Sequence, residues 1–127
     1  EDDIWTGNNE LVTNGDFATD SDWTKGTGWT ISNGVATYDG VGNTNITQTS
    51  NTDGGTTYNL TVEITDKTQG GIFSVLGAVS GSTYNTVGVH SENITTTSSA
   101  ALFINSSNNL IGSIDNVSIK KIIEVAS

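Results

Sequence analysis

The most regular hydrophobic pattern in the chain is a two-residue alternation that runs from Tyr58 to Ile64. Successive side chains of a β-strand point to opposite faces, so a period of two predicts a strand with one buried face. The polar residues between the apolar ones are expected to face solvent. The predicted inward set is Tyr58, Leu60, Val62 and Ile64.

Shorter segments of the same kind recur along the chain, and clusters of Gly, Asn and Asp separate them. Segment 101–105 is apolar at consecutive positions, which predicts a central strand. Val87 and Val89 are expected to point inward, and His90, which alternates with them, to point outward. The other predicted strands are 11–13, 29–32, 35–38, 46–49, 73–79 and 117–123.

One turn is specified by two residues. Asn33-Gly34 separates two short alternating segments, and this dipeptide favours a type I′ turn between paired strands. In total the pattern predicts about eight strands and no long helix. Many short strands divided by turns indicate an all-β sandwich or barrel. Two antiparallel sheets packed face to face, as in a β-sandwich, would bury the inward sets.

Composition agrees with a β-rich domain and narrows its chemistry. Ile and Val together number 22 against 5 Leu, and β-branched side chains favour strands. Ser, Thr, Asn and Gly make up about half of the chain, as in many extracellular and virion proteins. The expected location is therefore extracellular or on a virion surface. Cys is absent, which excludes disulfides, thiol catalysis and thiolate metal sites.

The chain is strongly acidic, with 14 Asp and Glu against 4 Lys and a formal net charge of −10. Such a charge repels phosphates and anionic lipids, so neither nucleic acid nor membrane is expected as a partner. No apolar run reaches the roughly 18 residues that suggest a membrane-spanning helix. The acidic side chains either keep the domain soluble or, in part, hold a hard cation such as calcium.

Few residues offer catalytic chemistry. The chain has one His, no Cys and no Arg, and it lacks a Gly-x-Ser-x-Gly nucleophile motif. Glycoside hydrolysis needs two carboxylates across a cleft. Glu63 is expected on a strand and Glu92 in a turn, and nothing in the sequence brings them together. The chain is therefore predicted not to be an enzyme.

The two ends differ from the body of the chain. Residues 1–9 form an acidic N-terminal arm with two apolar anchors, residues 10–122 the β-domain, and residues 123–127 a C-terminal tail. Each end either pairs into the sheet of its own chain or docks on another subunit. An assembly, possibly a homo-oligomer, is the expected partner. The predicted assembly contacts are Ile4, Trp5, Ile123 and Val125.

Four segments together resemble a known family. They are ELVTNGDFATDSDWTKGTGWTISNGVATYDG (10–40), NITQTS (45–50), GGTTYNLTVEIT (54–65) and GSIDNVSIKKI (112–122). In this order they resemble the galactose-binding-like, carbohydrate-binding-module superfamily. The similar copies are those found in bacteriophage tail, fibre and other virion proteins. The opening and closing segments carry most of the resemblance, because the middle segments are common in β-proteins.

The resemblance implies a jelly-roll sandwich whose first and last strands are adjacent, with one structural calcium ion where they meet. Asp115 matches the Asp of the family's closing motif. The Glu that usually follows the Phe of the opening motif is replaced by Ala18, so Asp16 or Asp20 would have to serve instead. Trp23, Trp29 and Tyr58 would be core residues.

The family contains both glycan binders and purely structural modules, so two functions are predicted. The first is a non-catalytic structural or display domain of a phage virion (a decoration, tail or fibre component) or of a cell-surface assembly. The alternative is a stand-alone module that recognises a cell-surface or extracellular polysaccharide. A sugar site needs an aromatic face and polar side chains that bind hydroxyls. The candidates are Tyr84, His90, Asn85 and Gln48, which could equally be exposed polar surface.

Overall fold

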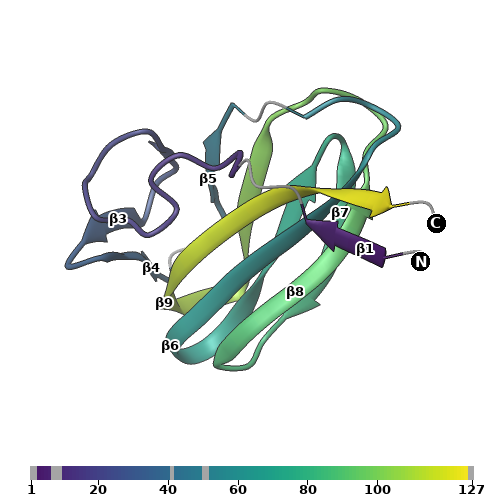
Figure 1. The fold of residues 1–127 in the computed structure, drawn as a ribbon. Coiled ribbons are helices and arrows are strands. Elements are labelled where there is room, and N and C mark those ends of the chain that lie inside the picture. Colours follow the sequence, from purple (N-terminus) through teal and green to yellow (C-terminus); the bar gives the residue numbers. More distant parts are fainter. Residues whose placement is uncertain (1–2, 7–9, 41, 50–51, 126–127) are drawn as a thin grey trace.

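The structure is a computed structural model that describes residues 3–6, 10–40, 42–49 and 52–125, with only the backbone described for 3–6 and 123–125. Every regular element among these residues is a β-strand, and all strand pairs are antiparallel (Figure 1). The strands are β1 (Asp3–Thr6), β2 (Thr24–Lys25), β3 (Trp29–Ser32), β4 (Val35–Asp39), β5 (Asn45–Gln48), β6 (Thr57–Leu76), β7 (Val79–Tyr84), β8 (Gly88–Thr95) and β9 (Leu102–Val125).

Two long strands, β6 with 20 residues and β9 with 24, pair with each other and hold the other strands. β8 and β7 pair with the two halves of β6, while β1, β4 and β5 pair with β9. β3 and β2 extend this arrangement through β4 and β5. The nine strands form one sheet, which bends over itself and nearly closes into a barrel (Figure 1).

The bend in the β6–β9 pair lies where the ladder is irregular. The register shifts three times between Ile64 and Gly71: the extra residue lies on β6 at the first two shifts, and the extra residues lie on β9 at the third, next to Gly70. Such bulges increase the local bend and twist of a strand. Gly70 occupies this bend with φ +71°, and a Cβ there would lie 2.5 Å from the carbonyl oxygen of Ser107. The close approach of the two backbones therefore requires glycine at this position.

A further bulge lets apolar side chains on both of its sides along β9 point into the core. Ile114 and Val117 are both buried although they are three residues apart, which a regular alternation does not permit. Asn116 has φ +50°, and the register with β6 shifts between Thr61 and Glu63. The extra residue reverses the alternation, and Asn tolerates this backbone conformation better than most residues.

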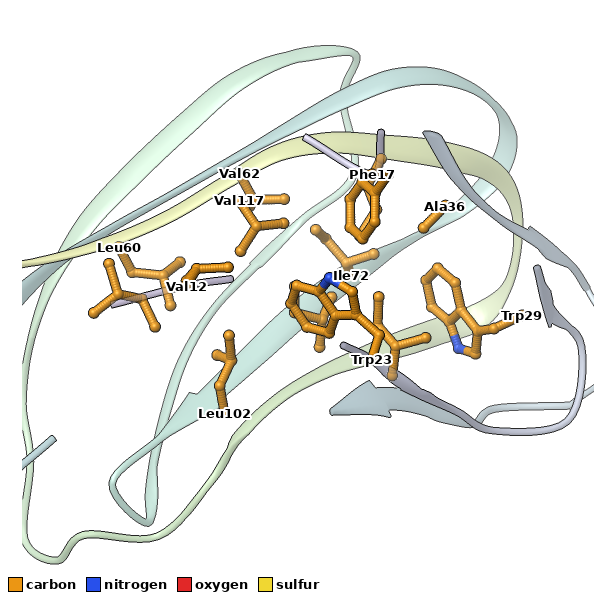
Figure 2. Close-up of a cluster of buried hydrophobic side chains, with 14 of the residues drawn as sticks. Val12, Phe17, Trp23, Trp29, Ala36, Leu60, Val62, Ile72, Leu102 and Val117 are labelled. Atoms are coloured by element: carbon orange, nitrogen blue, oxygen red, sulfur yellow. The ribbon is translucent and has the colours of Figure 1, made fainter. Parts of the chain in front are cut away.

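The core lies inside the folded sheet and contains most of the aromatic residues (Figure 2). Trp23 stands against Phe17 with ring centroids 5.4 Å apart, and Trp29 against Tyr38 at 5.1 Å. Both pairs have the tilted geometry that aromatic rings favour. Each large side chain buried in this way contributes on the order of 2 kcal/mol to folding. The prediction that Trp23, Trp29 and Tyr58 are core residues is confirmed.

Several sequence predictions are confirmed by the strands. Asn33 (φ +53°) and Gly34 (φ +77°) form the turn between β3 and β4, in agreement with a type I′ geometry. The inward set from Tyr58 to Ile64 is buried on β6. Segment 102–105 is central, because it pairs with β5 on one side and β6 on the other.

Other predictions about these strands were wrong. Segment 11–13 is irregular rather than a strand. Val87 and Val89 do not point inward: they are 60% and 67% exposed, and His90 lies on the inward side of β8, which Ile94 continues into the core. The register accounts for the error: His90 is opposite the buried Val62 of β6, whereas Val89 is opposite Glu63 on the outer face.

The first and last described segments lie side by side. Leu11 N donates to Ile119 O over 3.0 Å, and Val117 N donates to Gly15 O over 2.9 Å. β1 then pairs with the end of β9, where Trp5 is opposite Ile123 and Ile4 is opposite Glu124. The arm and the tail thus pair with each other within one chain. The side chains of the predicted assembly contacts lie outside the described residues.

Candidate functional site

The sugar-site candidates Tyr84 and His90 meet between β7 and β8. These strands follow each other in the chain but pair with different halves of β6 rather than with one another. The ring of Tyr84 stacks on the imidazole of His90, with centroids 4.4 Å apart and planes 9° apart. Tyr84 lies at the end of β7 and His90 on the inward side of β8, so the stack bridges the nearly closed sheet. We refer to Ser82, Tyr84, His90 and Glu92 as the β7–β8 seam.

A carboxylate completes the seam. The Tyr84 hydroxyl donates to Glu92 Oε2 over 2.5 Å, and the backbone N–H of Ser82 donates to the same carboxylate at 3.0–3.1 Å. Glu92 therefore supplies the acceptor that a neighbouring strand would supply in a continuous ladder. Burial raises the pKa of Tyr84, and the hydrogen bond to Glu92 and its negative charge raise it further, so the phenol stays protonated.

His90 is held at its other side by the loop before β8. Its Nε2 lies 2.7 Å from Thr86 O, a distance at which the ring nitrogen donates to the carbonyl. The imidazole thus has one face on Tyr84 and one nitrogen on the backbone. This arrangement positions two rings and a carboxylate at an open edge, and it also ties two strands together.

The other two sugar-site candidates lie elsewhere. Asn85 is exposed in the turn that follows β7, next to Tyr84. Gln48 is buried on β5, which β9 and β6 separate from β7. Its side chain accepts from Thr13 N over 2.9 Å and donates to Thr13 O over 3.0 Å. Gln48 thus anchors the irregular N-terminal segment to the sheet.

Glu92 was missed as a member of this cluster because the sequence analysis placed it in a turn, which was wrong. It lies on β8. His90 and Glu92 are two residues apart, so on a strand they share a face. That spacing was the signal available from the sequence, and the incorrect inward assignment of Val87 and Val89 concealed it.

The metal candidates Asp16 and Asp115 lie near each other and near Glu63. Asp115 pairs in register with Glu63, whose Oε1 accepts from Asn116 Nδ2 over 2.8 Å. Partial burial raises the pKa of Asp115, and the charges of Glu63 and Asp16 raise it further, whereas a hydrogen bond from Asn116 N lowers it. The charges of Glu63 and Asp16 therefore both disfavour the ionised form of Asp115.

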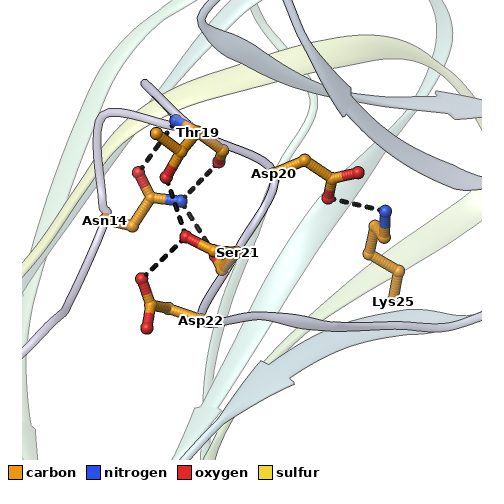
Figure 3. A network of polar contacts seen from close by, with 6 residues as sticks. All are labelled: Asn14, Thr19, Asp20, Ser21, Asp22 and Lys25. Carbon is orange, nitrogen blue, oxygen red and sulfur yellow. Dashed lines mark hydrogen bonds and ion pairs between the residues drawn. The ribbon is translucent and has the colours of Figure 1, made fainter.

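The third metal candidate, Asp20, belongs to a different group of contacts (Figure 3). It forms an ion pair with Lys25, with Oδ1 and Nζ 2.6 Å apart. The surrounding loop is organised by Asn14, whose amide donates to Thr19 O and Ser21 O and accepts from Thr19 N. Asp20 thus has a cation of its own and lies in a loop fixed by backbone contacts.

The fit of a calcium ion to these residues is incomplete. Calcium takes six to eight oxygen ligands. In the described part of the chain, no three acidic or imidazole side chains are grouped so that they could hold a metal ion. Nearby carbonyls are already engaged, since Gly15 O accepts from Val117 N and Asn14 O from Phe17 N and Trp23 Nε1. Asp16 and Asp115 are the residues that a bound cation would use.

Comparison with known proteins gives no assignment for this chain. No model of a protein family matches the sequence, and no curated protein matches it significantly. Within the described ranges there is also no helix with the length and apolarity needed to cross a membrane.

Proposed function

We propose that the chain is a non-catalytic structural and display domain of an extracellular assembly, such as a phage virion or a cell surface. In this proposal the folded sheet is a jelly-roll sandwich of the galactose-binding-like, carbohydrate-binding-module type. The main support is the pairing of β1 with the end of β9, where Asp3 is opposite Val125. Both ends of the described chain therefore leave the same edge (Figure 1), and the opposite end of the domain faces away from any attachment.

The polar side chains of the described residues support a structural role. Glu92 and His90, which could serve in acid–base chemistry, connect strands or bind a loop carbonyl. Glu10 is used in the same way, because its carboxylate accepts from Ser118 Oγ over 2.5 Å and from Ile119 N over 2.7 Å. These groups hold the fold together rather than converge on a cleft.

The assembly role can be tested by light scattering combined with amide hydrogen exchange on the full chain. We expect self-association at micromolar concentration and slow exchange of the amides in β1. Trp5→Ser should weaken the association without lowering the melting temperature by more than a few degrees. Val89→Ser, a change at an exposed strand position, is the matched control. A monomer whose β1 amides exchange as fast as those of an unfolded peptide contradicts the proposal.

A second candidate function is a glycan-binding module. The observation in its favour is the parallel stack of Tyr84 and His90 beside the exposed Asn85, at an open edge of the sheet. A glycan array probed with the full chain tests it. Binding that is lost in Tyr84→Ala or His90→Ala supports a site at the seam, and binding to no glycan on the array excludes this function.

We also propose one structural calcium ion bound through Asp16 and Asp115. A cation there would relieve the repulsion between these carboxylates and Glu63. A ligand that binds only the folded state stabilises it by mass action. Calcium should therefore raise the melting temperature, chelator should reverse the increase, and Asp115→Asn should abolish it. An unchanged melting temperature rejects the site, and Asp20→Asn is the control that should leave the increase intact.

A further inference from the structure

The outer face of four neighbouring strands carries two rows of side chains that form a continuous surface. In one row Thr47 of β5, Phe103 of β9 and Val75 of β6 are register partners. In the next row Asn45, Asn105 and Phe73 are partners in the same way. Residues directly opposite in antiparallel strands share a face, so the two rows lie side by side. We call this surface the outer aromatic face.

Phe73 and Phe103 differ from the other described aromatic residues. Five of those are buried in the core, and Tyr84 is stacked in the β7–β8 seam. Phe73 and Phe103 instead alternate with buried neighbours, Ile72 and Ile104, and so point out of the sheet, where both stay partly exposed. Because they occupy adjacent rows of paired strands, they lie diagonally about 7 Å apart, within reach of one ligand.

The groups around the two rings are neutral and polar. Asn45 Nδ2 donates to Asn105 Oδ1 over 3.3 Å, and on β7 both rows end in exposed hydroxyl side chains. None of the residues at these register positions is charged, although the chain as a whole carries −10. The outer face of the other half of the sheet differs, since Glu63 and Lys120 lie on it and no aromatic side chain among the described ones does.

The size of the face indicates the kind of partner. Four strands and two rows span about 20 by 12 Å, given the strand spacing and the rise per residue. That area is well below the roughly 800 Å² per partner that a stable protein interface buries. Ring faces flanked by amides and hydroxyls, without charge, match the C–H faces and hydroxyl groups of sugar rings.

We propose that the outer aromatic face binds a short stretch of a neutral polysaccharide, with Phe73 and Phe103 as stacking platforms and Asn45, Asn105 and Thr47 as hydrogen-bonding groups. This inference rests on the second proposed function, glycan binding, and assigns it to a surface distinct from the β7–β8 seam. The aromatic pair sets the position of the sugar rings. The amides provide both donors and acceptors, so they suit hydroxyl groups in either role.

Affinity electrophoresis tests the proposal, with gels that contain soluble β-glucan, xyloglucan, glucomannan or galactan, and alginate as the anionic comparison. At least one neutral polysaccharide should retard the full chain. Alginate should not, because the chain and alginate are both negatively charged and repel each other. Phe73→Ser and Phe103→Ser should each weaken retardation about tenfold or more, the loss expected for removing one well-placed aromatic contact. Phe103→Tyr should retain binding, and Val89→Ser is the control for an outward strand position on the other half of the sheet. Thermal unfolding of each variant shows that the fold is kept.

Three outcomes overturn the inference, and they separate it from the function on which it rests. Failure of every neutral polysaccharide to retard the full chain rejects both glycan binding and this site. Retardation that survives in Phe73→Ser and Phe103→Ser but is lost in His90→Ala keeps glycan binding and moves it to the seam. A dimer in light scattering that Phe73→Ser abolishes, without any effect of polysaccharide, identifies the face as an interface between copies of the chain.

Discussion

At the residue scale, two buried serines on neighbouring strands differ in their hydrogen bonds and therefore in their expected contribution to stability. Ser106 Oγ accepts from Thr44 N over 2.9 Å and lies 3.1 Å from Thr44 O, so it fixes the segment before β5. Ser74 is completely buried, and its hydroxyl has no hydrogen-bond partner among the described residues. A buried polar group without a partner lowers stability, because water no longer solvates it.

These two serines give a matched pair of substitutions. Ser74→Ala should leave stability unchanged or raise it by up to about 1 kcal/mol, since it removes an unsatisfied hydroxyl. Ser106→Ala should cost about 1–3 kcal/mol, since it leaves the backbone N–H of Thr44 without its acceptor, although Thr44 O still accepts from Ser106 N. Urea unfolding of both variants measures the difference. A loss larger than about 1 kcal/mol in Ser74→Ala means that the hydroxyl has a partner after all.

Asp115 gives a residue-scale prediction with a defined pH dependence. Burial, Glu63 and Asp16 raise its pKa in the folded state above that in the unfolded state, so folding favours the protonated form. Asp115→Asn should therefore raise the melting temperature at pH 7 in chelator. The advantage should shrink as the pH falls through the aspartate range, where the wild-type side chain becomes neutral as well. Thermal melts from pH 7 to pH 3 test this, and an advantage that grows toward acid pH contradicts it.

At the scale of elements, the bend of β6 depends on backbone geometry at Gly70. Gly34 has nearly the same φ, +77° against +71°, but a Cβ at Gly34 meets nothing within 4 Å. Gly34→Ala should therefore lower the free energy of unfolding by about 1–2 kcal/mol, the energy needed to hold a residue with a Cβ in the left-handed conformation. Gly70→Ala should cost at least about 2 kcal/mol more, because its Cβ meets backbone atoms of Ser107 and Leu110. Equal losses in urea unfolding would show that the bend can relax.

The sequence predicted those elements in which local chemistry acts alone. Asn33-Gly34 specified the turn between β3 and β4, and the alternation from Tyr58 to Ile64 specified both a strand and its buried face. The length of β6 and β9 was not predictable in the same way. Two consecutive glycines such as Gly70 and Gly71 usually end a strand. Here they lie at a bend within β6, and the strand continues beyond them because β9 pairs with it on both sides of the bend. Pairing between distant segments thus overrode the local pattern.

The candidate site was predictable only in part, and the reason lies at the same scale. The sequence selected Tyr84 and His90, which do meet, but it also selected Gln48, which anchors Thr13 from inside the sheet. Which face of β8 points inward depends on its register with β6. Val87 and Val89 look like core residues in a short window, but both face solvent, and Val89 is opposite Glu63 on the outer face. The outer position of Phe103 likewise became visible only from its register with Val75.

At the scale of the whole molecule, β6 and β9 belong to both halves of the folded sheet, so the halves should unfold together. Amides on either side of the bend, such as those of Leu60 and Ile72, should exchange with the same free energy of opening. The amides of the edge strand β2 should exchange faster, because β5 is the only described strand that pairs with β2. Native-state hydrogen exchange in low urea measures these values. Different limiting free energies for Leu60 and Ile72 would show two independently unfolding units.

The antiparallel pairing of β1 with the end of β9 has a mechanical consequence. A force that pulls the two ends apart acts across this pair at its open end, so its hydrogen bonds load one after another, as in a zipper. Such peeling needs less force than sliding two strands past each other, where all the bonds resist at once. Under tension β1 would therefore detach from β9 first and form an extended linker, while the core stays folded. The folded core of a domain attached through these two ends would therefore carry little of the applied force.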